Sequence, residues 1–193
     1  LDARVRVSAS QPAGAANFAI RPYPAELIES WDWNGQPVTL RPIRPEDEAQ
    51  HRAFLEQLDP EDIRLRVFYS RRHIEHSELA RLTQIDYARE MAFIATRLLE
   101  GGGEETLGAV RVAIDPDNRD AEFGVIVRSD LKGGGLGRRL MDKMIGHLRQ
   151  RGTQRLVGEV LLENRGMRAM CQRLGFDERR DDGLVRVTLA ARS

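Results

Sequence analysis

The sequence predicts an α/β fold built around one mixed β-sheet. Short segments of alternating or continuous apolar residues are interleaved with segments of helical periodicity, in the order β-α-α-β-β-β-α-β-α-β-β. In addition, the clearest helix, 136–150, follows a strand, 121–127, through a turn that contains four glycines. No internal repeat of roughly 20 to 50 residues is present, so a repeat architecture is not expected.

The first half of the chain is expected to open the sheet with one strand, 38–41, whose side chains alternate. Two helices follow. Pro45 suits the first turn of one, and Asp59 with Pro60 suits the start of the other. A short helix is expected over 77–83. The remaining strands of this half are 91–96, 107–114 and 121–127, the first two joined by a glycine-rich hairpin turn.

The second half is expected to begin with the amphipathic helix 136–150. Its apolar residues recur on one helix face, at Leu136, Leu140, Met141, Met144, Ile145 and Leu148. A strand at 155–162 and a helix at 164–174 follow, and Gly175 suits the C-terminal cap of that helix. Two final strands are expected at 176–178 and 184–189.

Length and composition limit the classes of function. The 193 residues suffice for one well-buried domain, with some left over. Lys plus Arg and Asp plus Glu both number 30, so the net charge does not indicate a nucleic-acid partner. The single cysteine, Cys171, excludes an internal disulfide framework and fits a reducing cytoplasm. The absence of a long apolar run and of a signal peptide argues against a membrane partner.

Residues 1–36 differ from the rest of the chain. Residues 8–17 are rich in Ser, Ala, Gly and Pro, which is typical of a linker, and the prolines near position 23 favour extended backbone. We interpret this region as the tail of a preceding domain plus a tether, and a loosely packed N-terminal arm is the alternative. The first residue is Leu1, so a processed or partial chain is expected. The compact domain is expected over 37–193.

The glycine-rich turn between the strand 121–127 and the helix 136–150 carries the clearest chemistry. Glycines at 133, 134, 135 and 137 allow positive φ angles and let a ligand approach the backbone. The first amides of a helix have no internal acceptors and lie at the positive end of its dipole. Between Arg128 and Arg155 there are eight basic and two acidic residues. The sequence therefore predicts a phosphate or diphosphate site here.

Two familiar phosphate-binding motifs do not fit this turn. A nucleotide-binding P-loop needs Gly-Lys-Ser/Thr, but Gly137 is followed by Arg138 and Arg139. A dinucleotide fingerprint needs a small residue where Arg138 or Leu140 stands. A helix entry that binds no ligand is the remaining alternative.

The pattern that does fit is Gln/Arg-x-x-Gly-x-Gly/Ala, with Lys132, Gly135 and Gly137 in its defined places. In this stretch the sequence resembles the GCN5-related N-acetyltransferase (GNAT) superfamily, with Lys132 a mild departure. The resemblance implies the GNAT acyl-CoA N-acyltransferase fold and a diphosphate of acetyl-CoA bound at the helix N-terminus, without a metal. The cofactor-binding residues that it implies are Val125, Ile126, Val127, Lys132, Gly133, Gly134, Gly135, Leu136, Gly137, Arg138, Asn164 and Arg168.

A second match follows at the expected distance. Asn164 opens a helix that ends in Leu174-Gly175-Phe176, as is common in the superfamily. The resemblance implies that Asn164 contacts the cofactor, whereas by itself Asn164 is a good helix N-cap. It also implies that backbone groups of Val125 and Val127 pair with the pantetheine amides, and that a strand amide polarises the thioester carbonyl.

Glu122 is the candidate general base. A lysine amine, with a pKa near 10.4, must lose a proton before it attacks a thioester. Glutamate-dependent members of the superfamily place their base near this position, and the alternatives are a solvated glutamate and a base role for Asp120. Many members use a tyrosine as general acid where Cys171 stands here, which puts a dedicated acid in doubt. His51 is expected on a helix surface, and His73, His76 and His147 suggest no metal site.

The segments 40–47 and 82–92 resemble one branch of the superfamily, the Pat-type bacterial protein lysine acetyltransferases. In this branch the GNAT domain follows an ADP-forming acyl-CoA-synthetase-like region, and residues 1–7 and 19–24 resemble the end of that region. The implied partners are acetyl-CoA, the upstream domain of the same chain, and a protein lysine acceptor such as an acyl-CoA synthetase. The acidic stretch 86–90 suits an open acceptor mouth or a solvated loop.

Three functions remain open at this stage. The first is acetylation of protein lysines by direct attack in a ternary complex. The second is acetylation of a small-molecule amine, which a closed acceptor pocket would favour. The third is a non-catalytic acyl-CoA sensor, which the missing tyrosine keeps open.

Overall fold

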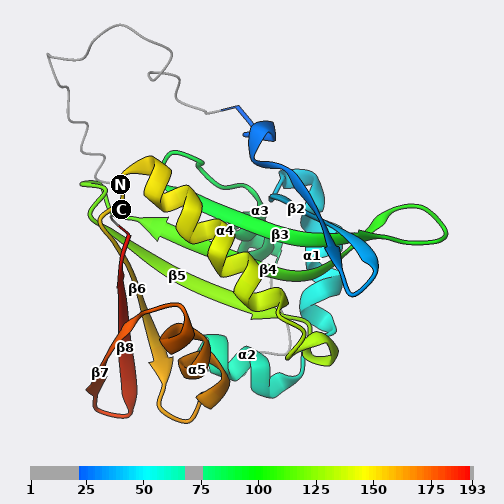
Figure 1. Cartoon of the computed structure of the whole chain (residues 1–193). Coiled ribbons are helices and arrows are strands. Elements are labelled where there is room, and N and C mark those ends of the chain that lie inside the picture. Colours follow the sequence, from blue (N-terminus) through cyan, green and yellow to red (C-terminus); the bar gives the residue numbers. More distant parts are fainter. Residues whose placement is uncertain (1–21, 68–75, 192–193) are drawn as a thin grey trace, which may run out of the picture.

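The described chain forms an eight-stranded mixed sheet with helices on both faces (Figure 1). The computed structural model describes residues 22–67 and 76–191. The sheet has the spatial order β1-β2-β3-β4-β5-β6-β8-β7. Its strands are β1 Glu29–Trp33, β2 Gln36–Pro42, β3 Glu90–Leu98, β4 Glu104–Ile114, β5 Asp120–Val127, β6 Arg155–Leu161, β7 Asp177–Asp181 and β8 Leu184–Ala190. The α-helices are α1 Glu48–Glu56, α2 Pro60–Val67, α3 His76–Thr83, α4 Leu136–Arg151 and α5 Arg165–Arg173.

The predicted α/β class is confirmed, and the observed element order is β-β-α-α-α-β-β-β-α-β-α-β-β. The third early helix is α3, which coincides with the short helix expected over 77–83. The additional strand is β1, which was not predicted. Within the described ranges, no helix combines the length and the apolar character needed to cross a membrane.

Strand β1 places the start of the sheet earlier than expected. It pairs antiparallel with β2 through a tight turn in which Asn34 and Gly35 both have positive φ angles, 54° and 79°. Asn-Gly is the preferred pair for such a hairpin turn, and the carboxylate of Asp32 accepts a hydrogen bond from the Gly35 amide. The folded domain therefore begins before the expected boundary at residue 37. The linker and strand expected within residues 1–21 lie outside the described residues.

Helix α4 covers one face of the sheet and closes the main core. All six of its predicted core residues are buried, and the helix packs on β3, β4 and β5. Gly152, with a φ angle of 76°, ends the helix in the left-handed conformation that favours glycine. Helices α1 and α3 lie on the other face (Figure 1). The core fixes the axis of α4, and therefore the direction in which its N-terminus points.

The parallel strands β5 and β6 pair over a short stretch only. The paired residues are Asp120 with Arg155, Ala121 with Leu156, and Glu122 with Val157. Beyond Glu122, β5 remains paired with β4 on its other edge, while β6 pairs with β8 along its whole length. The two strands therefore diverge, and the edge of β5 that faces β6 has no strand partner among the described residues past Glu122.

A buried ion-pair network ties the helical face to the sheet. Arg41 on β2 binds both carboxylate oxygens of Asp47 at 2.7 Å and Glu104 at 2.8 Å. Burial by itself lowers the pKa of Arg41, but the hydrogen bonds to the two carboxylates outweigh that effect and the pKa is raised. The network holds the chain before α1 against the β3–β4 hairpin.

His51 was expected on a helix surface, and this is wrong. Its side chain is buried beside Phe54, and burial lowers the pKa of His51 to about 4. The helix pattern around it was too short to indicate which face of α1 meets the sheet.

Replacing Asp47 should test the buried network. Asp47→Ala leaves the Arg41 guanidinium buried with Glu104 as its remaining acid, so we expect a loss of about 3 kcal/mol in the free energy of unfolding. The measurement is urea denaturation followed by circular dichroism. The control is Glu46→Ala, at an exposed neighbouring position, with an expected change below about 0.5 kcal/mol. Equal effects of the two variants would contradict a specific role for the network.

Candidate functional site

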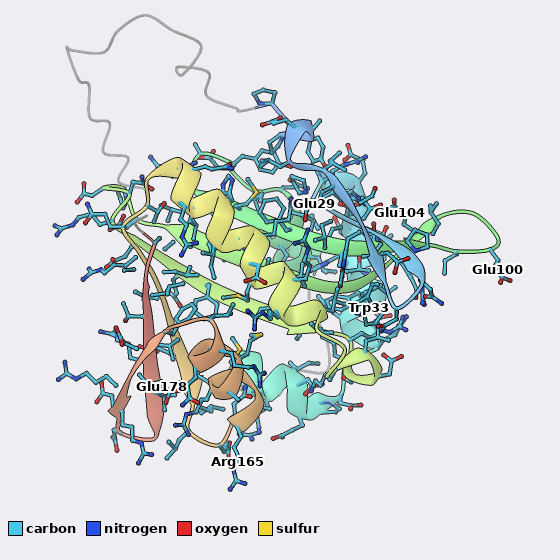
Figure 2. All side chains as sticks on the ribbon, viewed as in Figure 1. Glu29, Trp33, Glu100, Glu104, Arg165 and Glu178 are labelled. Carbon is cyan, nitrogen blue, oxygen red and sulfur yellow. The ribbon has the colours of Figure 1, made fainter. Side chains whose placement is uncertain are left out.

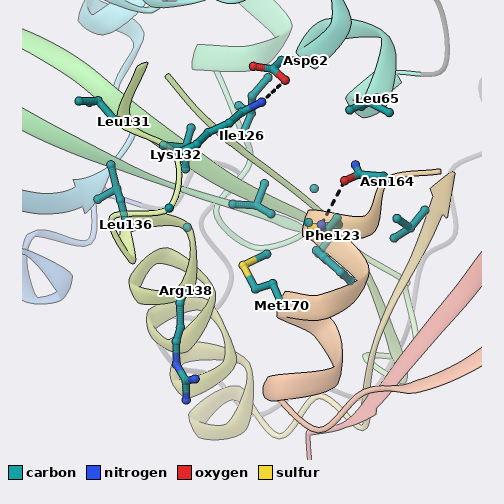
Figure 3. Close-up of a pocket in the computed structure, with 18 of the residues that line it drawn as sticks. Asp62, Leu65, Phe123, Ile126, Leu131, Lys132, Leu136, Arg138, Asn164 and Met170 are labelled. Carbon is teal, nitrogen blue, oxygen red and sulfur yellow. Dashed lines mark hydrogen bonds and ion pairs between the residues drawn. The ribbon is translucent and has the colours of Figure 1, made fainter. Parts of the chain in front are cut away.

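A pocket occupies the gap where β5 and β6 diverge (Figure 3). Its volume, about 440 Å³, lies within the range typical of small-molecule sites. Its walls come from α2, β5, the start of α4, β6 and α5. The lining residues are Asp62, Leu65, Phe123, Gly124, Val125, Ile126, Val127, Leu131, Lys132, Gly133, Gly135, Leu136, Gly137, Arg138, Glu159, Val160, Asn164, Gly166, Met167, Met170 and Arg173.

Residues 132–138, which we call the glycine turn, form the end of this pocket at the N-terminus of α4. Gly133 and Gly135 have φ angles of 79° and 83°, which residues with a Cβ atom rarely adopt. The first hydrogen bond into α4 runs from the Arg139 amide to the Gly135 carbonyl at 3.0 Å. The amides of residues 136–138 precede that bond, so they lack helical acceptors. The turn therefore offers backbone donors and the positive end of a helix dipole to an anion.

Lys132, the first residue of the glycine turn, is paired with Asp62, a residue that no sequence pattern related to the turn. Its ammonium group binds Asp62 of α2 (Figure 3). Asp62 also accepts a hydrogen bond from the Ser129 hydroxyl at 2.6 Å. The Asp62 side chain is 8 % exposed. Asp62 thus neutralises much of the Lys132 charge and holds α2 against the turn.

Helix α2 also reaches the opposite wall of the pocket. Arg64 binds Glu163, which immediately precedes Asn164, at 2.7 Å. Together with the Asp62 contact, this ion pair links both sides of the gap between β5 and β6 through one short helix.

The local excess of basic residues near the turn is largely compensated by acids from other elements. Arg139 and Lys143 both bind Glu29 of β1, at 2.8 Å and 3.1 Å. Arg138 lines the pocket, but its side chain extends along α4 toward Asp142 (Figure 3). The backbone amides are consequently the most direct anion donors of the turn.

Most of the residues expected to bind the cofactor line the pocket, and two do not. The carbonyl of Gly134 accepts a hydrogen bond from the Trp33 side chain at 2.7 Å, behind the turn. Arg168 binds Glu178 at 2.9 Å and donates to the Leu162 carbonyl, so its guanidinium is used within the α5 region. The expected cofactor contact of Arg168 has no support from this arrangement.

Asn164 lies at the pocket wall and also caps α5. Its Oδ1 atom accepts a hydrogen bond from the Met167 amide at 3.1 Å (Figure 3). The two interpretations of this residue are therefore compatible, because capping uses the oxygen and leaves the side-chain amide group for a ligand.

Cys171 stands inside the core rather than at a reacting position. Its side chain is fully buried, and burial, with a smaller contribution from Glu178, raises the pKa of the thiol to about 12. Cys171 is neutral at physiological pH and does not line the pocket, so its position in the core gives it no access to a leaving group. No Tyr, His or Cys lies among the described residues that line the pocket.

Glu122 lies where the pairing of β5 and β6 ends. Its side chain is exposed and has no hydrogen bond or ion pair with any described residue. By strand alternation it points to the face opposite Phe123 and Val127, and thus away from α4. Glu122 does not itself line the pocket, whose wall begins at Phe123.

Asp120 and Glu159 are the other carboxylates near this position. Asp120 binds Arg155 through two contacts, at 2.6 Å and 2.7 Å, and these hydrogen bonds lower the pKa of Asp120. Asp120 is therefore a weaker base than a free carboxylate. Glu159, on β6, lines the pocket and has an exposed ion pair with Arg186 at 3.5 Å. The sequence did not predict Glu159 as a site residue, because its position relative to Glu122 depends on the pairing of β5 with β6.

His, Cys, Asp and Glu are the usual metal ligands, and their grouping can be described in the part of the chain that the structure covers. No three His, Cys, Asp or Glu residues within it are grouped to hold a metal ion. His73, one of the three histidines considered in the sequence, lies outside the described residues.

The chain matches a family model and resembles characterised folds. Residues 59–176 match the model described as the acetyltransferase (GNAT) family. The chain is 32 % identical over 154 residues to the Pseudomonas aeruginosa protein Acetyltransferase PA5475, covering 80 % of this chain and 82 % of that protein.

Two solved structures illustrate the likeness of the fold. The GNAT domain of S. lividans PAT is 25 % identical, with a TM-score of 0.78 over 88 % of this chain and 99 % of that one. The Vibrio cholerae spermidine N-acetyltransferase in complex with CoA and spermine is 20 % identical, with a TM-score of 0.62 over 80 % of this chain and 95 % of that one. The second likeness supports the fold alone.

The ion pair between Lys132 and Asp62 leads to a testable prediction about anion binding. Asp62→Asn removes the charge that neutralises Lys132, so we expect the affinity for coenzyme A to rise about 3- to 10-fold at low salt. Added salt screens the Lys132 charge, so the gain should shrink at about 0.5 M NaCl. The measurement is isothermal titration calorimetry at two salt concentrations.

The double variant Asp62→Asn/Lys132→Gln is the control, because it lacks the ammonium group that Asp62→Asn frees. Its affinity should return close to that of the unmodified chain. A gain that persists in the double variant would mean that Asp62 acts on the site through something other than Lys132.

Proposed function

Because this chain belongs to the GNAT family of acetyltransferases, we propose that it transfers an acetyl group from acetyl-CoA to the side-chain amine of protein lysines. Family membership makes the chain an acyl-CoA-dependent N-acetyltransferase, which binds acetyl-CoA and an amine acceptor. The observation that carries the proposed transfer to an amine is the pocket that joins the glycine turn to the open edge of β5. Glu122 lies beside this pocket, at the last paired position of β5.

The glycine turn would hold the diphosphate of coenzyme A. The amides of residues 136–138 lack helical acceptors, and Gly133 and Gly135 leave the approach free of Cβ atoms. The pantetheine arm would follow the unpaired edge of β5 over 125–127, where backbone groups are available in the way that a further strand would use them. Asn164 would contact the arm from the other wall.

The reaction requires a neutral amine beside the thioester. Glu122 would accept a proton from the acceptor ammonium group, directly or through a water molecule. The neutral amine nitrogen then attacks the thioester carbonyl carbon, the C–N bond forms, and the C–S bond breaks with release of the coenzyme A thiolate. The second proton that the nitrogen loses as the amide forms passes through water to that thiolate or to solvent. An amide of β5 would stabilise the charge that develops on the carbonyl oxygen. The pocket has no tyrosine among the described residues, so the thiolate would leave without a dedicated acid from this set.

The GNAT domain of S. lividans PAT is similar to this chain over 99 % of its own length, in keeping with a Pat-type branch. The Pat-type resemblance of the segments 40–47 and 82–92 points the same way. The proposal therefore includes an acyl-CoA synthetase as acceptor, an acyl-CoA-synthetase-like domain upstream in the same polypeptide, and a cytoplasmic location.

A small polyamine is the second candidate acceptor. The fold is shared with a spermidine N-acetyltransferase, and the exposed carboxylates of Glu122 and Glu159 could attract a polycation.

One experiment separates the two acceptors. The chain is first titrated with coenzyme A by calorimetry, and then incubated with acetyl-CoA and either an acyl-CoA synthetase or spermidine. Mass spectrometry identifies the acetylated product and maps modified lysines. We expect acetylation of the protein at defined lysines. Acetylation of spermidine alone would replace the lysine proposal, and absence of coenzyme A binding would refute the proposed function.

Replacing Glu122 tests the base. Glu122→Gln should lower kcat about 100-fold or more near pH 7 and leave the affinity for coenzyme A unchanged. The deficit should shrink as the pH rises toward the lysine pKa near 10.4, because more of the acceptor is then already deprotonated. The measurement is a pH–rate profile.

Asp120→Asn is the matched control, since Asp120 lies on the same strand and face but is engaged by Arg155. Its kcat should stay within about 3-fold of the unmodified chain. Full turnover of Glu122→Gln across neutral pH would remove Glu122 from the mechanism.

A further inference from the structure

We propose that Trp33 is a positioning residue that fixes the orientation of the Gly134–Gly135 peptide group in the glycine turn. The inference rests on the proposed coenzyme A site and adds to it a residue from the strand β1. Figure 2 shows Trp33 at the end of β1, near the start of α4.

The contact between Trp33 and the turn is close and polar. The indole Nε1–H donates a hydrogen bond to the Gly134 carbonyl oxygen at 2.7 Å, although the two residues are 101 positions apart in the sequence. The Trp33 side chain is buried, with 7 % of the residue exposed. A Cβ atom at position 134 would lie 2.8 Å from the indole Cζ2 atom, so the ring can approach this closely only because Gly134 has no side chain.

Peptide geometry turns this contact into a constraint on the pocket. In a trans peptide group the C=O and N–H bonds point in opposite directions. The Gly134 carbonyl points toward Trp33, so the Gly135 amide points away from it. Gly135 lines the pocket and Gly134 does not, which places Trp33 behind the turn and the amide on the pocket side. The Gly135 amide makes no hydrogen bond to any described residue, so it is available to a ligand.

A peptide group between two glycines needs such a constraint. Neither residue has a Cβ atom to restrict its backbone angles, and no side chain of the described residues caps the N-terminus of α4 at Gly135. In the reversed orientation the carbonyl oxygen would face the pocket and repel a diphosphate. The hydrogen bond from Trp33 therefore favours the orientation in which the turn presents a donor.

The strand that carries Trp33 is fastened to the same helix. Glu29 of β1 binds Arg139 and Lys143 of α4, and the Arg139 guanidinium carbon lies over the Trp31 ring, 5.9 Å from the ring centroid. Among the described strands, β1 lies at the edge of the sheet and pairs with β2. These contacts keep Trp33 in a fixed position relative to the N-terminus of α4.

The test compares two acetyl donors that differ in the diphosphate. Trp33→Phe keeps an aromatic ring and removes the Nε1–H donor. We expect the KM for acetyl-CoA to rise about 5- to 10-fold, as for the loss of one hydrogen bond, with kcat unchanged. The kcat/KM for S-acetylpantetheine, which has no diphosphate, should not change. Tyr23→Phe, which removes a hydrogen-bond donor to the Pro42 carbonyl at the far end of β2, is the control and should affect neither donor.

A second variant reaches the same peptide group from the other side. Gly134→Ala pushes the indole ring away and should produce the same loss with acetyl-CoA and none with S-acetylpantetheine. Gly146→Ala in α4 is its control, because a Cβ atom there meets nothing within 4 Å.

The outcomes separate this inference from the function on which it rests. Equal losses with both donors, or no change with acetyl-CoA in Trp33→Phe, would overturn the positioning role while leaving the proposed function intact. An unmodified chain that binds no coenzyme A would refute the proposed function itself, and the positioning role with it.

Discussion

The short parallel pairing of β5 and β6 is the constraint on which the rest of the site depends. The two strands share three residue pairs and then separate, because β6 continues along β8 while β5 continues along β4. Packing enforces the separation on one face, where the Phe123 ring lies against Gly158 and Phe176. A Cβ atom at position 158 would come within 2.6 Å of that ring, so the close approach requires glycine. The gap that results exposes a strand edge and faces the N-terminus of α4.

Most basic side chains around this gap are paired with carboxylates, so little unpaired positive charge remains there. The basic residues around the glycine turn are matched by Asp62, Glu29 and Asp142, which come from α2, β1 and α4 itself. A site built on free ammonium and guanidinium groups would bind anions of many shapes. A site in which backbone amides are the main donors selects for a ligand that fits the curvature of the turn. The compensation also fastens α2 and β1 to the turn, so the same ion pairs shape the pocket.

The sequence predicted the parts of the fold in which local pattern and tertiary structure agree. The strand, glycine turn and helix over 121–150 lie where expected, and each of the six apolar positions of α4 is buried. The same local reasoning placed Asn164 at the start of α5. In these segments, periodicity and capping residues act within a few positions of each other, which a single sequence can reveal.

The features that the sequence did not reveal depend on contacts across long separations. Asp62 and Lys132 are 70 residues apart, and Trp33 and Gly134 are 101 apart, so no local pattern relates them. Strand β1 was missed because its alternating Ser, Trp and Asp residues are few, and its Asn34-Gly35 turn was assigned to a linker. Arg168 was expected to contact the cofactor, but its guanidinium binds Glu178 instead. The proximity of Glu178 depends on how β7 packs beside α5, which the sequence does not reveal.

The sheet separates two faces of the domain, and the gap between β5 and β6 connects these faces. This arrangement explains why the two substrates would meet at β5. Residues that alternate along β5 point to opposite faces, so Val127 lies on the side of α4 and Glu122 on the other. A cofactor held by the α4 N-terminus would reach the opening from one face, and an amine would reach it from the face that carries Glu122. The strands separate immediately after Glu122, so the Glu122 carboxylate lies beside the opening, and the pocket wall begins at the next residue, Phe123. A base in that position can pass a proton to solvent, while the thioester would lie farther along β5, where an amide of the strand can polarise its carbonyl.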